Sequence, residues 1–205
     1  MEEVILSDSQ RDALQEVANI GVAHAATALS QMVNKEIQMG IPKVELIPFE
    51  NIADHLGPME AVAAVFLKIT NELPSYSMLL ISQESAYALA DILIGNTPDT
   101  SKQMLTEMDE SALMEVGNVM MCAFFDSLAE LLSIPLIPGP PAFAFDSPLA
   151  VLDYILIQIG EVADKVLLFA TNVQTEKEKT FEINIFLVPE PASIRIILQK
   201  LGMDS

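Results

Sequence analysis

The feature that most constrains the fold is an internal repeat. At an offset of 99 residues, residues 12–42 align with residues 111–141 without a gap. Eight of the 31 aligned positions are identical, where chance would give about two, so we interpret the repeat as real. Each half alone is near the size at which a hydrophobic core becomes marginal. We therefore predict a single domain over residues 1–205, built from repeats at about 8–98 and 107–202.

The pattern of apolar residues predicts the same order of elements in both halves. Helical spacing covers 8–34, 83–94, 109–133 and 190–201, and strand-like runs cover 36–48, 60–70, 75–82, 142–148, 152–160, 165–174 and 180–188. We expect a loop between the first two strands, a hairpin tip at 175–180 and a polar seam at 96–109. The order helix–strands–helix, found twice, predicts an α/β fold. Its mixed, largely antiparallel sheet would be packed by the two long helices.

Composition excludes several classes of function. The chain has 29 Asp and Glu residues against 10 Lys and Arg, a formal charge of −19. Such a surface repels a phosphate backbone, so we expect no nucleic-acid partner, and an anionic membrane is disfavoured for the same reason. The longest apolar run, Ala61 to Leu67, is far shorter than the roughly 20 residues of a membrane-spanning helix.

Two features of the sequence indicate a cytoplasmic protein. The N-terminal Met-Glu-Glu lacks the basic region of a signal peptide. The single cysteine, Cys122, excludes an internal disulfide framework. We expect a soluble, acidic, cytoplasmic protein that does not enter a membrane.

Polar residues recur within the repeat at fixed spacing. The first copy reads Asp12-x₃-Glu16-x₂-Asn19-x₂₂-Pro42, and the second reads Ser111-x₃-Glu115-x₂-Asn118-x₂₂-Pro141. At about 100° per residue, the first three positions of each copy lie within roughly 60° of one another on a helix. An apolar stripe lies opposite, running from Leu14 to Met32 in the first helix and from Leu113 to Leu131 in the second. Each half should therefore present a carboxylate and a carboxamide outward from a rigid helix.

These residue types limit the chemistry. A Glu and an Asn are not a nucleophile–base pair, and no His or Ser is placed to form a triad with them. A carboxamide is not usefully basic, but it can orient a water by donating and accepting hydrogen bonds. Phosphoryl hydrolysis is a reaction that needs mainly a positioned water. For one copy alone a solvated helix face would be the simpler interpretation; the second copy argues against it.

The doubled pattern [Asp/Ser]-x₃-Glu-x₂-Asn-x₂₂-Pro resembles the CheC family of chemotaxis phosphatases. The resemblance covers essentially the whole chain, including Ile20-Gly21 after Asn19 and Gly117 before Asn118. It implies a hydrolase that removes the aspartyl phosphate from the CheY response regulator. By that resemblance, both Asn residues of the repeat would position the attacking water, and both Glu residues would contact a regulator lysine. The Mg²⁺ would belong to the regulator rather than to this chain, and CheD, a receptor deamidase, would be a second partner.

Several alternatives stay open beside that interpretation. The chain could be a non-catalytic adaptor that binds CheY-phosphate or CheD. CheX-like relatives resemble the pattern in one copy and act as dimers, and FliY-like relatives add flagellar-motor segments, which we do not see after residue 202. Two copies and no such segment favour the CheC type.

The remaining candidate residues receive structural interpretations. Asp12 and Ser111 are expected to be helix caps or rim contacts, and Pro42 and Pro141 to set the turn into a strand beside the site. Cys122 could edge the second site, but a small packing residue is favoured. His24 and His55 are too few for a His-based metal site, and no metal-ligand or nucleotide-binding spacing occurs in the sequence.

Overall fold

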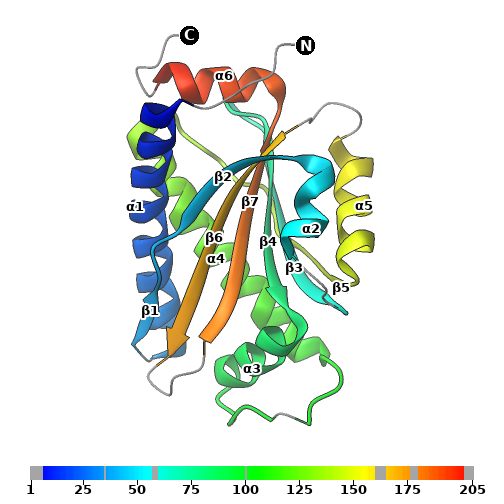
Figure 1. Ribbon diagram of the computed structural model, residues 1–205. Coiled ribbons are helices and arrows are strands. Elements are labelled where there is room, and N and C mark those ends of the chain that lie inside the picture. Colours follow the sequence, from blue (N-terminus) through cyan, green and yellow to red (C-terminus); the bar gives the residue numbers. More distant parts are fainter. Residues whose placement is uncertain are drawn as a thin grey trace.

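The fold is built on one antiparallel sheet with helices on both faces, as Figure 1 shows. The computed structural model describes residues 7–34, 36–56, 60–99, 101–159, 165–175 and 180–200. The elements in chain order are α1 (Asp8–Val33), β1 (Ile37–Met39), β2 (Lys43–Pro48), η1 (Phe49–Asn51), α2 (Ile52–Leu56), β3 (Val62–Ile69), β4 (Ser75–Ser82), α3 (Gln83–Leu93), α4 (Glu107–Leu132), β5 (Ala142–Asp146), α5 (Pro148–Ile159), β6 (Lys165–Thr175), β7 (Thr180–Pro189) and α6 (Pro191–Lys200).

The strand order reflects the internal repeat, because exchanging the strands of one half for those of the other reverses the order of the sheet. The order is β1-β6-β7-β4-β3-β5, with β2 also paired to β6, and every described pairing is antiparallel. The central pair β4–β7 joins the two halves of the chain. On either side of it, the edge strands of each half pair with the other half: β1 and β2 with β6, and β5 with β3. The predicted α/β class, with its pseudo-twofold and largely antiparallel sheet, is confirmed.

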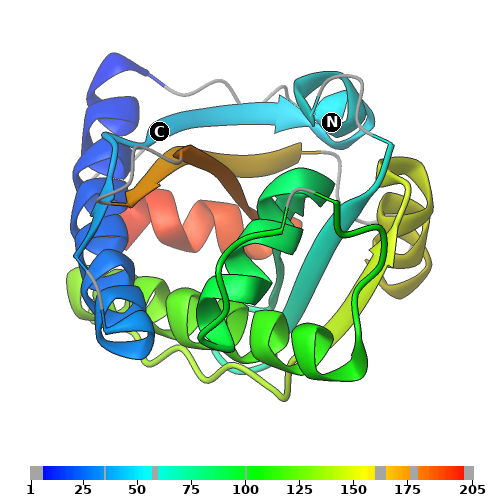
Figure 2. The same cartoon turned by 90° about the horizontal axis from the view of Figure 1, so that it is seen from below.

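The sheet separates two apolar layers. One layer lies under α1, α3 and α4, and the other lies under α2 and α5. In Figure 2, the view from below, α1 (blue) lies at the left of the strands and α4 (green) runs along the bottom of the view. Alternate residues of β3 pack into opposite layers. Val65 and Leu67 pack into the first layer, and Ala64 and Phe66 pack into the second. This burial on both faces explains the continuous apolar run in that part of the sequence.

The two long helices begin and end in matching ways. Ser7 caps α1 and Thr106 caps α4, and each forms a capping box with the third residue of its helix. Asn34 and Ser133, which are 99 positions apart, end the helices in the left-handed conformation, with φ of 49° and 52°. The predicted helices 8–34 and 109–133 are confirmed to within two residues.

Three local expectations are wrong. Residues 152–160 were expected to be a strand, but α5 covers Pro148–Ile159. The predicted strand 36–48 is interrupted between β1 and β2, and part of the loop expected after it folds into η1 and α2. Met32 and Leu131, expected in the apolar stripes, are 38% and 41% exposed. Each stands three residues after a buried leucine, Leu29 or Leu128, and so lies about 60° round the helix, at the edge of the buried face. The tip of the expected hairpin, 176–179, lies outside the described residues.

The region expected to be a polar seam holds a buried charge cluster. The Lys102 ammonium contacts Asp91 of α3 at 2.7 Å and Asp109 of α4 at 2.8 Å. Both aspartates are buried. The backbone N–H of Asp99 also donates to Asp91. The segment therefore joins the end of α3 to the start of α4 and helps to fix where α4 begins.

Helix α4 is long and apolar enough to span a membrane by length and composition alone. Half of its most apolar window is buried inside the protein. Phe124 and Phe125 are completely buried and pack in the layer between α4 and the sheet. These contacts are those of a core helix.

Candidate functional site

The polar face of α1 carries the first motif copy beside the segment that joins β1 to β2. Glu16 is exposed and Asn19 is half-buried. The Gln15 side-chain N–H groups donate to Asn19 Oδ1 at 3.3 Å and to the backbone carbonyl of Pro42. The carboxamide of Asn19 is therefore held at the surface of the helix and linked to the start of β2.

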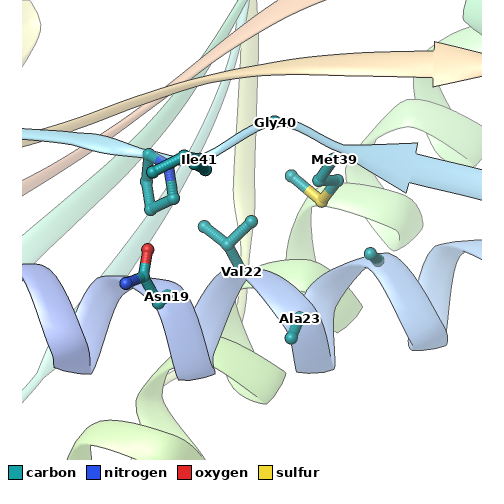
Figure 3. Close-up of a pocket in the computed structure, with 8 residues that line it drawn as sticks. Asn19, Val22, Ala23, Met39, Gly40 and Ile41 are labelled. Carbon is teal, nitrogen blue, oxygen red and sulfur yellow. The ribbon is translucent and has the colours of Figure 1, made fainter.

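A shallow pocket of about 310 Å³ opens next to Asn19. Its walls come from α1 and from the segment between β1 and β2, and are mostly apolar: Asn19, Val22, Ala23, Ala26, Met39, Gly40, Ile41 and Pro42. Figure 3 shows the Asn19 side chain pointing from the helix toward the Gly40–Ile41 segment. Ile41 is 87% exposed. The site thus combines a fixed carboxamide with an apolar surface that a partner protein could contact.

The second motif copy lies on α4 in a similar setting. Glu115 is exposed and Asn118 is half-buried, as in the first copy. Here the Cys122 thiol donates to Asn118 Oδ1 at 3.6 Å. Burial raises the pKa of Cys122, and the negative charges of Asp126 and Glu115 raise it further. The neutral thiol is the form that can donate this hydrogen bond.

Asp12 and Ser111 occupy the first position of the two motif copies. Asp12 and Ser111 are exposed, and neither is the N-cap, since Ser7 and Thr106 fill that role. The cap interpretation of these two positions is therefore wrong, and a rim position remains.

The prolines of the motif occupy equivalent places. Pro42 immediately precedes β2 and is buried, and Pro141 immediately precedes β5 and is half-buried. Both stand where the chain turns into an edge strand. The positions agree with a structural role for each proline.

The glycines near the motif have packing roles. A Cβ on Gly21 would lie 2.3 Å from Phe124 Cδ2, and a Cβ on Gly117 would lie 2.6 Å from Val65 Cγ2. Gly21 thus permits the close contact of α1 with α4, and Gly117 the contact of α4 with β3. Gly117 directly precedes Asn118 and Gly21 is two residues after Asn19, so these close contacts help to position the two motif asparagines.

The remaining polar candidates have structural partners. His24 Nδ1 lies 2.7 Å from Ser127 Oγ, which links α1 to α4. His55 Nε2 lies 3.7 Å from a Glu45 carboxylate oxygen. Across the residues that the structure describes, no group of three or more His, Cys, Asp and Glu side chains is arranged to hold a metal ion.

Sequence reasoning placed the motif residues on the polar face of each helix but missed their neighbours. Gln15 was not singled out, although a Gln four residues before an Asn on a helix is a recognisable hydrogen-bonding pair. Cys122 was placed correctly beside the second site, but its packing role was favoured. It has both roles, because it also packs against the core under α4.

Comparisons with known proteins show which proteins the chain is similar to. The sequence pattern of the CheC-like family matches residues 10–46 and 108–144, which include both motif copies. The chain is 29% identical over 201 residues to the CheY-P phosphatase CheC of Bacillus subtilis strain 168, covering 96% of both chains.

Two further relatives carry a flagellar name. The chain is 31% identical over 136 residues to the flagellar motor switch phosphatase FliY of B. subtilis, covering 66% of this chain and 35% of that protein. The crystal structure of Thermotoga maritima FliY superimposes with a TM-score of 0.79 at 21% identity, covering 97% of this chain and 98% of that chain. The structural likeness supports the fold described above.

Proposed function

We propose, from the premise that this chain belongs to the CheC-like family, that it hydrolyses the aspartyl phosphate of a phosphorylated CheY-type response regulator. The reaction would end the chemotaxis signal. Asn19 and Asn118 would position the attacking water in the two sites, and Glu16 and Glu115 would contact the regulator.

One observation carries this proposal. In both α1 and α4, an exposed glutamate and a half-buried asparagine stand three residues apart on the polar side of a helix whose other side is buried. An exposed carboxylate can meet a cationic side chain of a partner, and a carboxamide beside it can reach into the partner's cleft. The family relationship supplies the identity of that partner.

The mechanism follows from what each group can do. A carboxamide both donates and accepts hydrogen bonds, so it can fix a water in line with the bond between phosphorus and the aspartyl oxygen. The water attacks phosphorus, the bond to the aspartyl oxygen breaks, and inorganic phosphate leaves. The Mg²⁺ that offsets charge on the phosphoryl oxygens would be supplied by the regulator.

The glutamates would orient the regulator relative to the helix and would take no part in breaking the bond to phosphorus. Glu16 and Glu115 would each pair with a lysine of the regulator active site and so set the angle at which the helix enters it. The net charge of −19 would assist approach to a basic cleft. We further propose that CheD is a second partner and that the protein works in the cytoplasm.

The test is the rate of phosphate loss from the regulator. A CheY-type regulator is charged with acetyl phosphate and Mg²⁺, and its dephosphorylation is followed with wild type, Asn19→Ala, Asn118→Ala and the double variant. We expect acceleration by wild type, partial loss in the single variants and no acceleration by the double variant. A double variant as active as wild type would disprove the two-asparagine mechanism.

The glutamates need a matched control. Glu130 is exposed on α4 but lies outside both motif copies. We expect Glu16→Lys and Glu115→Lys to raise the regulator concentration needed for half-maximal rate, and Glu130→Lys to leave it near the wild-type value. Binding of phosphorylated CheY without any acceleration would instead support the adaptor function.

A further inference from the structure

We propose that Gln15 is a positioning residue for Asn19, and that the two sites hold their carboxamides by different means. This inference rests on the proposed function, since it concerns how the water-positioning group is oriented. It assigns to Gln15 a role that neither the doubled motif nor its spacing includes.

The contacts of Gln15 carry the argument. Its single side-chain nitrogen donates to Asn19 Oδ1 at 3.3 Å and to the carbonyl of Pro42. A carboxamide NH₂ group has two hydrogens, so both are used. Gln15 is half-buried, between the helix and the segment leading to β2. The contact therefore joins three parts of the site: the helix, the asparagine and the strand entrance.

This arrangement fixes the direction of the Asn19 side chain. An unrestrained carboxamide rotates about its terminal torsion and can present either oxygen or nitrogen to the partner. With Oδ1 held toward Gln15, the NH₂ group of Asn19 is the end left to meet a water. Restricting this rotation before the regulator binds removes part of the ordering cost from the reaction.

The second site lacks this device. Met114 stands at the position equivalent to Gln15, and a thioether cannot donate a hydrogen bond. Asn118 instead receives its hydrogen bond from Cys122, one turn farther along the helix, at 3.6 Å. Ala23 stands at the position equivalent to Cys122. The restraint thus comes from the N-terminal side in α1 and from the C-terminal side in α4, and its donor is an amide in one site and a weaker thiol in the other.

The experiment isolates the first site with Asn118→Ala and then changes Gln15. In that background we expect Gln15→Met, which copies the second site, to lower kcat about three- to tenfold, the range that one hydrogen bond accounts for. KM for the phosphorylated regulator should change less than twofold, because Gln15 is half-buried and both of its side-chain hydrogens are bonded within this chain. Gln31→Met, at an exposed glutamine of α1, is the control and should keep the kcat of the background.

A second variant separates hydrogen bonding from packing. Gln15→Glu keeps the size and shape of the side chain, but the carboxylate has no hydrogen to donate at neutral pH. We expect it to lower kcat as Gln15→Met does. If Gln15→Glu retains the kcat of the background while Gln15→Met does not, the residue acts by packing and the inference is wrong.

A spectroscopic measurement tests the contact without any activity. In ¹⁵N-labelled protein, Gln15→Met should shift the side-chain NH₂ resonances of Asn19 and leave those of Asn118 in place. Unchanged Asn19 resonances would overturn the inference. So would a kcat in the Asn118→Ala background that depends on Asn19 but not on Gln15. The proposed function fails by a different result, a double variant Asn19→Ala/Asn118→Ala with full activity.

Discussion

Gly21 of α1 lies directly against the ring of Phe124 in α4, so close that a Cβ on Gly21 would be 2.3 Å from Cδ2 of the ring. Phe124 is completely buried and also packs against Phe169 of the sheet, with ring centroids 4.8 Å apart. The ring is therefore enclosed between α1 and the sheet. Because Gly21 is two residues from Asn19, the contact sets the position of the first site as well as the helix crossing.

We predict that Gly21→Ala destabilises the protein by about 1–3 kcal/mol, the usual cost of overpacking a core. Ala favours helix more than Gly does, so the measured cost is net of that gain. Denaturant unfolding followed by circular dichroism would measure it. Adding Phe124→Leu, which shortens the opposing side chain, should recover part of the stability lost in Gly21→Ala. An unchanged midpoint in Gly21→Ala would contradict the close contact.

Lys102→Met should be strongly destabilising. It removes the cation between two buried carboxylates, Asp91 and Asp109, and breaking a buried ion pair typically costs about 3–5 kcal/mol. The measurement is the shift in urea midpoint at pH 7. Lys43→Met is the matched control, because Lys43 pairs with Glu45 while its own side chain is 76% exposed. Such a surface pair contributes about 0–1 kcal/mol; equal losses at both sites would contradict the prediction.

Stability should fall in acid partly through Asp109. Burial alone would raise the pKa of Asp109, but hydrogen bonds from Lys102 and Thr106 outweigh it and hold the pKa below the ordinary value. The folded protein therefore binds this proton less readily than the unfolded chain, so the contribution is complete above the ordinary aspartate pKa of about 3.9 and is lost as pH falls through the lowered folded value.

The measurement is the free energy of unfolding between pH 7 and pH 2. Asp109→Asn should be less stable than wild type at pH 7, and the difference should shrink on acidification. A difference that stays constant over this range would mean that Asp109 is not the titrating group.

Ser133→Gly should stabilise the end of α4. Ser133 is exposed and adopts φ of 52°, a conformation that costs a residue with a Cβ about 1–2 kcal/mol and glycine almost nothing. The expected gain is about 0.5–1 kcal/mol after the greater flexibility of glycine in the unfolded chain is included. Asn34→Gly tests the equivalent position, and its gain should be smaller because Asn tolerates this conformation. Thermal unfolding of the two variants side by side would decide it.

The long helices could be predicted because several local signals coincide with the repeat. Both have a capping residue before the first turn and polar residues at the motif spacing. The failure at α5 is instructive. Its Val, Leu and Ile residues resemble a buried strand, but Val151, Leu152 and Ile155 are buried while Asp153 is exposed, which is a helical pattern. The Ser147-Pro148 pair before it is a helix-start signal, and the Ala150 N–H donates to Ser147 Oγ.

The shared helix face of the motif residues was predictable from the sequence, but the fine geometry around Asn19 was not. Spacing alone places Glu16 and Asn19 on one helical face, because that depends only on helix geometry. The direction of the Asn19 carboxamide depends on Gln15 and on a carbonyl 27 residues away from Gln15. A contact of that range follows from how β2 packs against α1, which periodicity does not determine.

Because the edge strands of each half pair with the other half, the sheet cannot be completed until late in the synthesis of the chain. Met39 of β1 pairs with Val173 of β6, so the first edge of the sheet has no partner until more than 130 further residues have been made. At about 5–20 residues per second, the ribosome needs roughly 7–27 s for this. Throughout that interval the newly made N-terminal half carries an open strand edge at β1 and β2. A chaperone that binds extended apolar segments would find its substrate there until β6 has been made.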